Sequence, residues 1–331
     1  MNGKLTKAIA LLTLVAVLVL AGCGSQPAKE EAKGQPQPQP AQKFVNIATG
    51  GTAGTYYPLG GAMAEILNKN VKGINATAQS TGASVANLNL LNEGKVEMAL
   101  VQNDIAFYAA QGAEMFKDKK IDGLAGIATL YPETIQIVTL ASKNIKSVAD
   151  LKGKKVAVGA AGSGTEANAR QILEAYGLSY KDLTAQYLNF ADAASNLKDG
   201  NVDAAFVTAG FPTAAIQDVA AQHKIALIPI ADDKIAALAK KYPFYTKVVV
   251  PGKTYTSLDQ DTVTVAVMAM LITKKSLDQN LVYDMTKAIF THLDRLAAAH
   301  AAGKLIQVKT ATNGMPVELH PGAKKFFDET K

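Results

Sequence analysis

The chain has 331 residues, a formal net charge of +6, a single cysteine and no tryptophan. One cysteine excludes an internal disulfide framework and a cysteine metal site. The basic residues are scattered lysine pairs separated by acids, with only two arginines, and this pattern argues against the clustered basic stripe of a nucleic-acid surface.

The first residues have the features of an export signal. Lys4 and Lys7 precede an uncharged apolar run, Ala8–Leu20, which is too short for a comfortable membrane span. Leu20-Ala21-Gly22-Cys23 follows and resembles a bacterial lipobox, in which cleavage precedes the cysteine and the thiol receives a lipid. We therefore predict a signal peptide over 1–22 and lipidation of Cys23. The alternative is an ordinary signal with an incidental cysteine.

A linker and a large folded body follow the signal. Residues 23–43 include GQPQPQPAQ, whose prolines favour an extended chain and whose composition offers no core. The body from Phe44 onward is long for one hydrophobic core and suits two. It has no stretch of 18 uncharged apolar residues, so we expect no membrane span there.

The first motif of the body is GGTAGTYYPLG, Gly50–Gly60. It follows a short apolar run, Phe44–Ala48, and leads into apolar residues at helical spacing. The pattern predicts a strand, a Gly/Thr loop and a helix. Backbone N–H groups at a helix N-terminus favour an anion, and the two threonines add hydroxyl groups.

A second region of the body repeats this design. The stretch Leu91–Asp104 matches Leu197–Gly210 at an offset of 106 residues. Five positions are identical and two keep their acidic charge: Leu91/Leu197, Gly94/Gly200, Val96/Val202, Ala99/Ala205, Val101/Val207, Glu93/Asp199 and Glu97/Asp203. Lys154–Leu173 likewise repeats the strand, Gly/Ser/Thr loop and helix pattern. The repeat predicts two lobes of similar α/β design.

The predicted fold is α/β and two-lobed, with a ligand cleft between the lobes. Leu124–Leu140 is a candidate first crossing between lobes and Asp261–Lys275 a candidate return, followed by a helix over Ser276–His300. Lobe I is predicted over 44–138 and 262–331, and lobe II over 139–261. In such sheets ligands lie beyond the carboxyl ends of the strands, where the polar loops of both lobes would meet.

No enzyme chemistry is indicated. The four histidines have no metal-ligand spacing, and neither a serine-hydrolase elbow nor a P-loop is present. Gly162–Ala167 fits a loose dinucleotide fingerprint, but Asn189-Phe190 replaces the acid expected after the next strand. An anion-binding helix start explains it better. We predict a binding protein without a metal or cofactor.

These residues resemble a known family. The lipobox, FVNIATGGTAGTYYPLGGAMAEILN, STGAS, VEMALVQNDIAFYAAQG and VAVGAAGSGTE are similar to the TAXI-type solute-binding subunits of TRAP transporters. The resemblance implies a type II periplasmic-binding-protein fold, an ion-gradient-driven TRAP permease as partner, and a small carboxylate or amino acid such as glutamate, glutamine or 2-oxoglutarate as ligand. Arg170 and Arg295 do not supply the arginine clamp of dicarboxylate receptors.

The resemblance also implies site residues, carried over position by position. The predicted ligand-binding set is Thr52, Gly54, Thr55, Tyr56 or Tyr57, Ser80, Thr81, Ser84, Gln102, Asp104, Ser163, Gly164, Thr165 and Thr208. Asp104 is predicted to pair with a ligand ammonium. For each of these, local capping is the alternative role.

The expected function is therefore that of a lipid-anchored, extracytoplasmic receptor that acts as a monomer and delivers its ligand to a permease. The alternative is a sensing or adhesive surface lipoprotein with the same fold. A neighbouring permease gene would favour the first, and a neighbouring sensor kinase the second.

Overall fold

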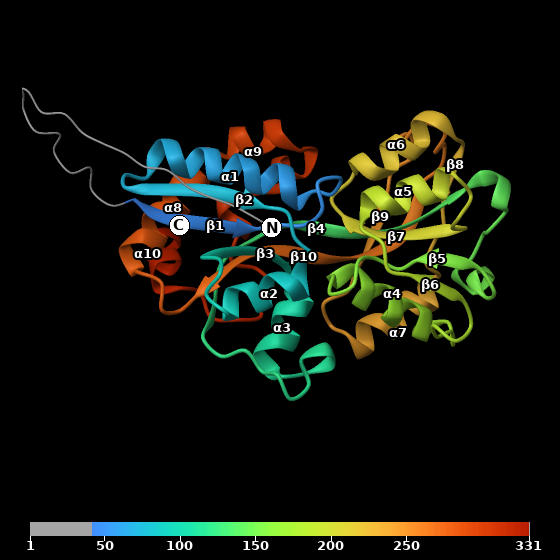
Figure 1. Ribbon diagram of the computed structural model, residues 1–331, viewed down its shortest axis with the longest axis horizontal. Helices are drawn as coiled ribbons and strands as arrows, with labels where there is room; N and C mark the ends of the chain where they lie inside the picture. The colour runs from blue at the N-terminus through green and yellow to red at the C-terminus, as the bar shows by residue number, and fades with distance from the viewer. Residues whose placement is uncertain (1–41, 331) are drawn as a thin grey trace, which may run out of the picture. The chain divides into compact units, whose positions relative to one another are not determined.

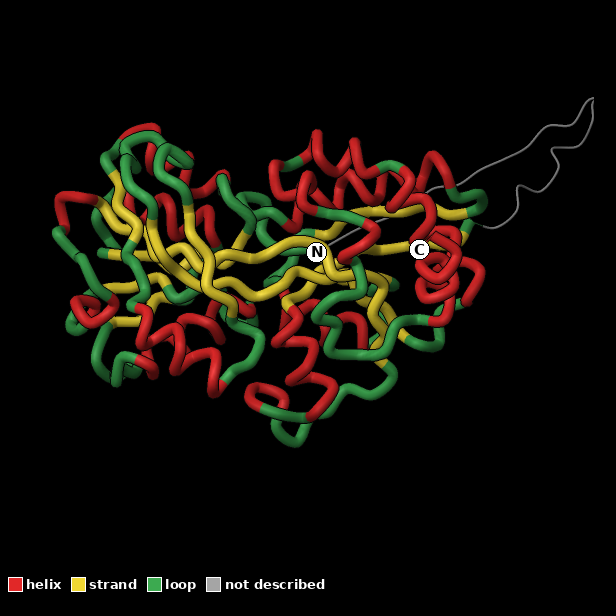
Figure 2. The backbone as a smooth tube through the Cα atoms, turned by 180° about the vertical axis from the view of Figure 1, so that it is seen from behind, coloured by secondary structure: helices red, strands yellow, loops and turns green. Residues whose placement is uncertain are grey.

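The computed structural model describes residues 42–330, all of which belong to one unit of the chain. The predicted signal peptide, Cys23 and nearly all of the linker lie outside the described residues. Figure 1 shows the elements in chain order, and Figure 2 shows from behind that the strands form a layer with helices on both sides. In the described part of the chain, no helix is both long enough and apolar enough to cross a membrane.

Ten strands form one mixed sheet. The strands are β1 (Lys43–Ala48), β2 (Ile74–Gln79), β3 (Met98–Gln102), β4 (Leu124–Leu140), β5 (Lys155–Ala157), β6 (Thr184–Gln186), β7 (Ala204–Ala209), β8 (Ile225–Leu227), β9 (Thr246–Val250) and β10 (Thr262–Lys274). Their order is β2-β1-β3-β10-β4-β7-β5-β6, with β8 paired to β4 and β9 to β10.

Within residues 42–330, ten α-helices cover this sheet. They are α1 (Tyr56–Asn70), α2 (Ser84–Asn92), α3 (Asn103–Gln111), α4 (Gly164–Ala175), α5 (Phe190–Lys198), α6 (Ala214–Gln222), α7 (Asp232–Lys241), α8 (Gln279–Thr291), α9 (Leu293–Ala299) and α10 (Pro321–Thr330). The single helix predicted over Ser276–His300 is wrong, because it breaks at His292 into α8 and α9. Residues 211–260, for which no individual helix or strand was predicted, form α6, β8, α7 and β9.

Two long antiparallel strands join the halves of the molecule, as the sequence predicted (Figure 1). β4 pairs with β10 through its first part and with β7 and β8 through its second part. β10 in turn pairs with β3, β4 and β9. We call the part built on β1–β3 with α1–α3 and α8–α10 the first lobe, and the part built on β5–β9 with α4–α7 the second lobe. The residue bounds predicted for the lobes stay a prediction.

The buried hydrophobic side chains form clusters on the two faces of the sheet. One cluster packs α1, α8 and α10 on the first lobe, including Met63, Met285 and Phe327. A second lies under α5 and α6 of the second lobe. A third continues across both lobes beneath α2, α3, α4 and α7, and contains both Ile105 and Ile172. The apolar packing is therefore shared between the lobes on that face.

The two copies of the internal sequence repeat have equivalent structures. β3 and β7 each follow a helix, α2 or α5, and each lies parallel to the first strand of its lobe, β1 or β5. Gly94 and Gly200 end the two helices with φ of +69° and +75°, values that glycine adopts without strain. The equivalence extends to individual hydrogen bonds.

Glu97 and Asp203 bind the neighbouring strand in the same way. A Glu97 carboxylate oxygen accepts from the N–H of Asn46 at 2.7 Å, and one of Asp203 accepts from the N–H of Lys155 at 2.9 Å. The backbone carbonyls of the two acids accept from the hydroxyls of Thr273 and Thr139, each at 2.7 Å. Glu97 and Asp203, one of the two acidic pairs retained in the repeat, thus support equivalent strand pairing in the two lobes.

Candidate ligand-binding site

A cavity of about 550 Å³, counted with the space at its mouth, lies where the two lobes meet. Its volume is in the usual range for small-molecule sites. The lining residues come from both lobes and from the crossing strand β4: Gly50, Gly51, Gly54, Thr55, Tyr56, Thr81, Gly82, Ala83, Ser84, Gln102, Tyr131, Glu133, Ala160, Ser163, Gly164, Thr165, Asn189, Phe190, Thr208 and Ala209. None of these lining residues is Lys, Arg or His.

Four helices begin at this cavity. α1 and α2 start in the first lobe at Tyr56 and Ser84, and α4 and α5 start in the second lobe at Gly164 and Phe190. All four starting residues line the cavity. The first N–H groups of a helix lack partners within the helix, and the helix dipole places partial positive charge there. The cavity wall is thus suited to a negatively charged group despite its lack of basic side chains.

The helix starts of the two lobes differ in capping. In the second lobe, Ser163 accepts from the N–H of Glu166 at 3.1 Å, and Asn189 accepts from the N–H of Asp192 at 3.0 Å. In the first lobe neither α1 nor α2 has a side-chain cap. The residue before α2, Ala83, has a φ of +71°, which is strained for a residue with a Cβ. The third residue of α1 is Pro58, which has no N–H, and the N–H of Ala86, the third residue of α2, donates to the carbonyl of Gly162 at 3.1 Å. The four helix starts therefore have similar donor capacity for a ligand.

Several buried polar atoms of the lining have no partner. Among the described residues, these are the hydroxyls of Tyr56 and Tyr131, Oε1 of Gln102 and Oε1 of Glu133. Each of these side chains is at least nine-tenths buried. Buried polar groups are nearly always hydrogen-bonded, so water or a ligand in the cavity is expected to bind these four atoms. A bound ligand with both acceptor and donor groups would do so.

Burial also raises the pKa values of titratable side chains that line the cavity. It raises the pKa of Glu133 to about 8, with nearby Asp104 adding to the effect and Tyr56 opposing it. Burial likewise raises the pKa of the Tyr56 and Tyr131 phenols well above their usual value. At neutral pH the empty cavity therefore carries a protonated Glu133 and two neutral phenols, and its wall has little net charge.

Ten of the predicted residues line this cavity. They are Gly54, Thr55, Tyr56, Thr81, Ser84, Gln102, Ser163, Gly164, Thr165 and Thr208. Several of their hydroxyl groups also form hydrogen bonds within the protein, as the alternative of local capping predicted. Ser84 accepts from the N–H of Gln102 at 3.1 Å, and Thr55 donates to the carbonyl of Gly210 at 3.2 Å. Their contact with a ligand stays a prediction.

The other predicted residues are not part of the cavity lining. Thr52 and Tyr57 are exposed, the latter by 37%. The hydroxyl of Ser80 donates to the carbonyl of Gly50 at 3.1 Å. Asp104 is fully buried, and its carboxylate accepts from the side chain of Asn168 at 3.1 Å and from the N–H of Ile105 at 2.9 Å. The structure thus places Asp104 in a contact between the lobes.

Asn168 is the centre of that contact. Its Oδ1 accepts from Gln102 at 2.9 Å and from Thr208 at 3.2 Å, while its Nδ2 donates to Asp104 and, at 2.9 Å, to Tyr245. Every hydrogen-bonding position of this buried amide is used. Gln102 and Asp104 belong to the first lobe, so Asn168 of the second lobe holds the lobes together beside the cavity.

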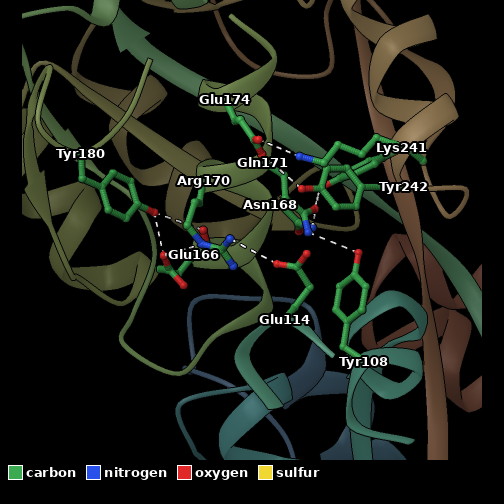
Figure 3. A network of polar contacts seen from close by, with 11 residues as sticks. Tyr108, Glu114, Glu166, Asn168, Arg170, Gln171, Glu174, Tyr180, Lys241 and Tyr242 are labelled. Carbon is green, nitrogen blue, oxygen red and sulfur yellow. Dashed lines mark hydrogen bonds and ion pairs between the residues drawn. The ribbon is translucent and has the colours of Figure 1, made fainter. Parts of the chain in front are cut away.

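More contacts between the lobes lie around α4, as Figure 3 shows. Gln171 of α4 donates to the hydroxyl of Tyr108 in α3 at 3.2 Å, and Arg170 contacts Glu114 at 3.3 Å. Arg170 also lies 3.8 Å from Glu166 on its own helix. Arg170 is therefore engaged outside the cavity, as Arg295 is with Glu65 at 2.8 Å.

Sequence reasoning missed part of the site. Tyr131 and Glu133 lie in β4, whose sequence was interpreted only as a crossing strand, and Asn189 and Phe190 were considered only against a dinucleotide fingerprint. The available signal was Glu133 itself, since a carboxyl inside an apolar, otherwise buried strand is rare without a partner or a function.

Comparison with known proteins gives the family. The model of the NMT1-like family matches residues 47–330. The chain belongs to the NMT1-like family. A putative aliphatic sulfonates-binding protein of Escherichia coli (strain K12) is 32% identical over 118 residues, 35% of this chain and 34% of that protein. The chain thus matches about a third of the length of this curated relative.

Solved structures share the fold. PhnD1 from Prochlorococcus marinus (MIT 9301), in complex with methylphosphonate, is 9% identical and overlaps 80% of this chain and 91% of its own, with a TM-score of 0.54. A protein from Bordetella bronchiseptica RB50 is 17% identical and overlaps 86% of this chain and 83% of its own, also at 0.54. The two-lobed periplasmic-binding-protein fold is thereby confirmed.

The comparisons correct the family prediction. The TAXI-type assignment is wrong, because the matching family model is the NMT1-like family and the curated relative is named for aliphatic sulfonates. The predictions of a TRAP permease as partner and of a glutamate-like carboxylate as ligand rested on that assignment, and they are wrong as well. The expectations of a solute receptor and of no enzyme activity do not depend on that assignment, and they stay predictions. No group of acidic, histidine or cysteine side chains among residues 42–330 could hold a metal ion.

Proposed function

We propose that the protein is an extracytoplasmic receptor that captures a small molecule with a compact oxyanion, of the sulfonate or phosphonate class, and delivers it to the permease of an ABC-type transporter. The observation that carries the proposal is the cavity with four helix starts and four unpartnered buried polar atoms. Helix N-termini and phenol hydroxyls are donors suited to sulfonate or phosphonate oxygens.

The absence of a basic side chain from the lining is compatible with this ligand class. Backbone N–H groups and oriented dipoles stabilise anions without a counter-charge, because they do not have to be desolvated as a mobile cation would. The starts of α1, α2, α4 and α5 are the places that we propose for the oxyanion. The name of the curated relative supports the same class of ligand.

The export route completes the proposal. The signal-like segment and Cys23 would place the receptor outside the cytoplasmic membrane, held by a lipid on the cysteine. The signal-like segment and Cys23 lie outside the described residues, and two experiments test the proposed lipid anchor. Mass spectrometry of the mature N-terminus should find a diacylated cysteine at position 23, and Cys23→Ala should release the protein from the membrane fraction. An unmodified Cys23 would overturn the anchor.

Ligand capture is tested on purified protein that has been unfolded and refolded to remove carried-over ligand. The chain has no tryptophan, so a thermal-shift assay with an external dye is preferable to intrinsic fluorescence. Methyl-, ethyl- and propyl-sulfonates and the matching phosphonates are screened together with sulfate and with sugars. A ligand at about 100 times its dissociation constant adds roughly 2.7 kcal/mol to stability. Stabilisation by sugars but by neither class of oxyanion would overturn the proposal.

A further inference from the structure

We propose that Asp104 is a proton-dependent latch between the two lobes. In this proposal, the carboxyl group of Asp104 takes up a proton when α4 of the second lobe packs on α3 of the first lobe, and it loses that proton when the lobes separate. A rise in pH should therefore favour separation. The inference goes beyond the proposed function, because it concerns the movement of the lobes and applies to any ligand.

The carboxyl group of Asp104 is bound from the opposite lobe. Asp104 lies at the start of α3, and its side chain is fully buried. The carboxylate accepts a hydrogen bond from the N–H of Ile105 in the same helix at 2.9 Å and another from Nδ2 of Asn168 at 3.1 Å. Asn168 lies on α4 and is also fully buried. The side chain that binds this carboxyl therefore belongs to the second lobe.

Other residues of the second lobe cover the same side of α3. Tyr245, which follows α7, is buried, and its hydroxyl accepts from Asn168 at 2.9 Å. Phe244 packs on two rings of α3, with its ring centroid 5.1 Å from that of Phe107 and 6.3 Å from that of Tyr108. Separation of the lobes would remove this cover and would admit water to the buried carboxyl.

The titratable groups that surround Asp104 in the described part of the chain supply no positive charge. They are the phenol of Tyr108 on α3, the phenol of Tyr245 in the second lobe and the carboxyl of Glu133 on β4. Each of these groups is either neutral or negative. An ionised Asp104 would therefore be a buried charge without a counter-charge, which is unfavourable.

The charged side chains of α4 are engaged elsewhere. Arg170 contacts Glu114 at 3.3 Å and Glu166 at 3.8 Å, as Figure 3 shows, and Glu174 contacts Lys241 at 2.6 Å. The packing of α4 on α3 thus brings a neutral amide to the carboxyl and excludes water from it. Such an environment favours the protonated acid.

Burial raises the pKa of Asp104 to about 7 while the lobes are in contact, although the hydrogen bonds from Ile105 and Asn168 oppose the rise. A carboxyl group of this type in water has a pKa of about 4. Between these values the lobes in contact hold a proton that the separated lobes have lost. The contact is therefore most favoured below about pH 4, weakens by up to about tenfold in its equilibrium constant for each further pH unit, and has lost this advantage by about pH 7.

The test measures the separation of the lobes by single-molecule Förster transfer, without a ligand. The chain without its signal peptide carries Cys23→Ala, so that dyes attach only to Gln111→Cys and Ala237→Cys. These two positions are exposed, on α3 and α7 respectively. We expect the equilibrium constant for lobe contact to fall at least tenfold between pH 5 and pH 8. Hydrogen exchange at the amides of α3, corrected for the intrinsic effect of pH on exchange, gives the same constant if one arrangement dominates.

Variants connect the decline to Asp104. Asp104→Asn keeps the shape of the side chain and cannot ionise, so we expect its lobe contact to resemble that of the wild type at pH 5 and to change less than threefold up to pH 8. The matched control is Asp278→Asn at the exposed start of α8, where the carboxylate accepts from the N–H of Leu281 at 2.8 Å. This control should keep the wild-type decline. Glu133→Gln, which removes the other buried carboxyl, should keep a decline of at least tenfold.

Three results would overturn the proposal. The first is a lobe contact that stays constant in the wild type from pH 5 to pH 8. The second is an unchanged decline in Asp104→Asn, and the third is the loss of the decline in Glu133→Gln, because another group would then be responsible. If Asp104→Asn does not fold, Asp104→Ser, which is also neutral, takes its place. Since no ligand is used, none of these results bears on the proposed function.

Discussion

The side chain of Gln102 occupies the space in which a Cβ on Gly164 would lie. Gln102 ends β3 of the first lobe, and Gly164 begins α4 of the second lobe. The lobes therefore approach each other here as closely as a glycine permits. Because both residues line the cavity, this contact links the closeness of the lobes to the shape of the ligand site.

A methyl group at position 164 should disrupt that approach. We expect Gly164→Ala to displace Gln102 or to keep the lobes apart, and overpacking of this kind costs about 1–3 kcal/mol. Ligand affinity should fall about tenfold or more, and small-angle X-ray scattering should show a larger radius of gyration. Gly61→Ala is the control, since a Cβ there meets nothing within 4 Å and alanine favours a helix. Equal affinity of Gly164→Ala and wild type would contradict the prediction.

Asn168 should be the most sensitive polar residue between the lobes. Asn168→Ala removes four hydrogen bonds and leaves the buried side chains of Gln102, Asp104 and Tyr245 without this partner. Since each unsatisfied buried group costs about 1–3 kcal/mol, we expect a loss of several kcal/mol in the free energy of unfolding, measured by urea denaturation.

The control for this variant is Asn196→Ala. The Asn196 amide donates to the carbonyl of Asp192 at 2.8 Å in an exposed part of α5, where water can replace the bond. Its loss should cost about 0.5 kcal/mol or less. A similar cost for both asparagines would show that the Asn168 network adds little to stability.

The sequence predicted most of the framework and only part of the site. The spacing of apolar residues and the positions of glycines predicted β1, α1, β2, β3 and both crossing strands, because these signals depend on residues close together in the sequence. The repeat of Leu91–Asp104 and Leu197–Gly210 predicted two similar lobes, since the same hydrogen bonds to Asn46 and Lys155 demand the same acids. Such reasoning works where a residue's role depends on its near neighbours in the chain.

The rest depended on contacts between distant segments. Asp104 was predicted to meet the ligand because it follows a strand, but the approach of α4 gives it Asn168 as partner, 64 positions away. Glu133 was overlooked because nothing near it in sequence indicates that β4 passes beneath a cavity. The break at His292 was also missed, since apolar spacing continues through it. The family was misjudged from loop motifs, because Gly/Thr loops at helix starts do not by themselves identify the ligand or the permease.

Stability should decline as pH rises through neutrality. Burial raises the pKa of Asp104 to about 7 and that of Glu133 to about 8, whereas in the unfolded chain both are near 4. Between these values the native state binds more protons than the unfolded state, so the stabilisation is complete below about pH 4 and is lost by about pH 8. Each group contributes on the order of a few kcal/mol to this change.

Urea unfolding at intervals from pH 5.5 to pH 9 measures the decline. His300 and His320 act in the opposite direction below about pH 6.5, because burial lowers the pKa of both, so the comparison must be made with variants. Asp104→Asn and Glu133→Gln should each remove part of the pH dependence. If both variants keep the wild-type slope, other groups must account for it.

Substitution of two buried tyrosines should distinguish a role in ligand binding from a role in the stability of the fold. The hydroxyl of Tyr131 lies at the cavity and has no hydrogen-bond partner among the residues that the structure describes. The hydroxyl of Tyr245 lies away from the cavity, donates to Gln171 at 2.6 Å and accepts from Asn168 at 2.9 Å. Tyr131→Phe removes an unsatisfied group, so the melting temperature of the empty protein should stay the same or rise while ligand affinity falls about tenfold. Tyr245→Phe should instead lower the stability by about 1–3 kcal/mol. Melting curves of both variants with and without ligand measure the difference. A destabilised empty Tyr131→Phe would mean that its hydroxyl serves the fold and not a ligand.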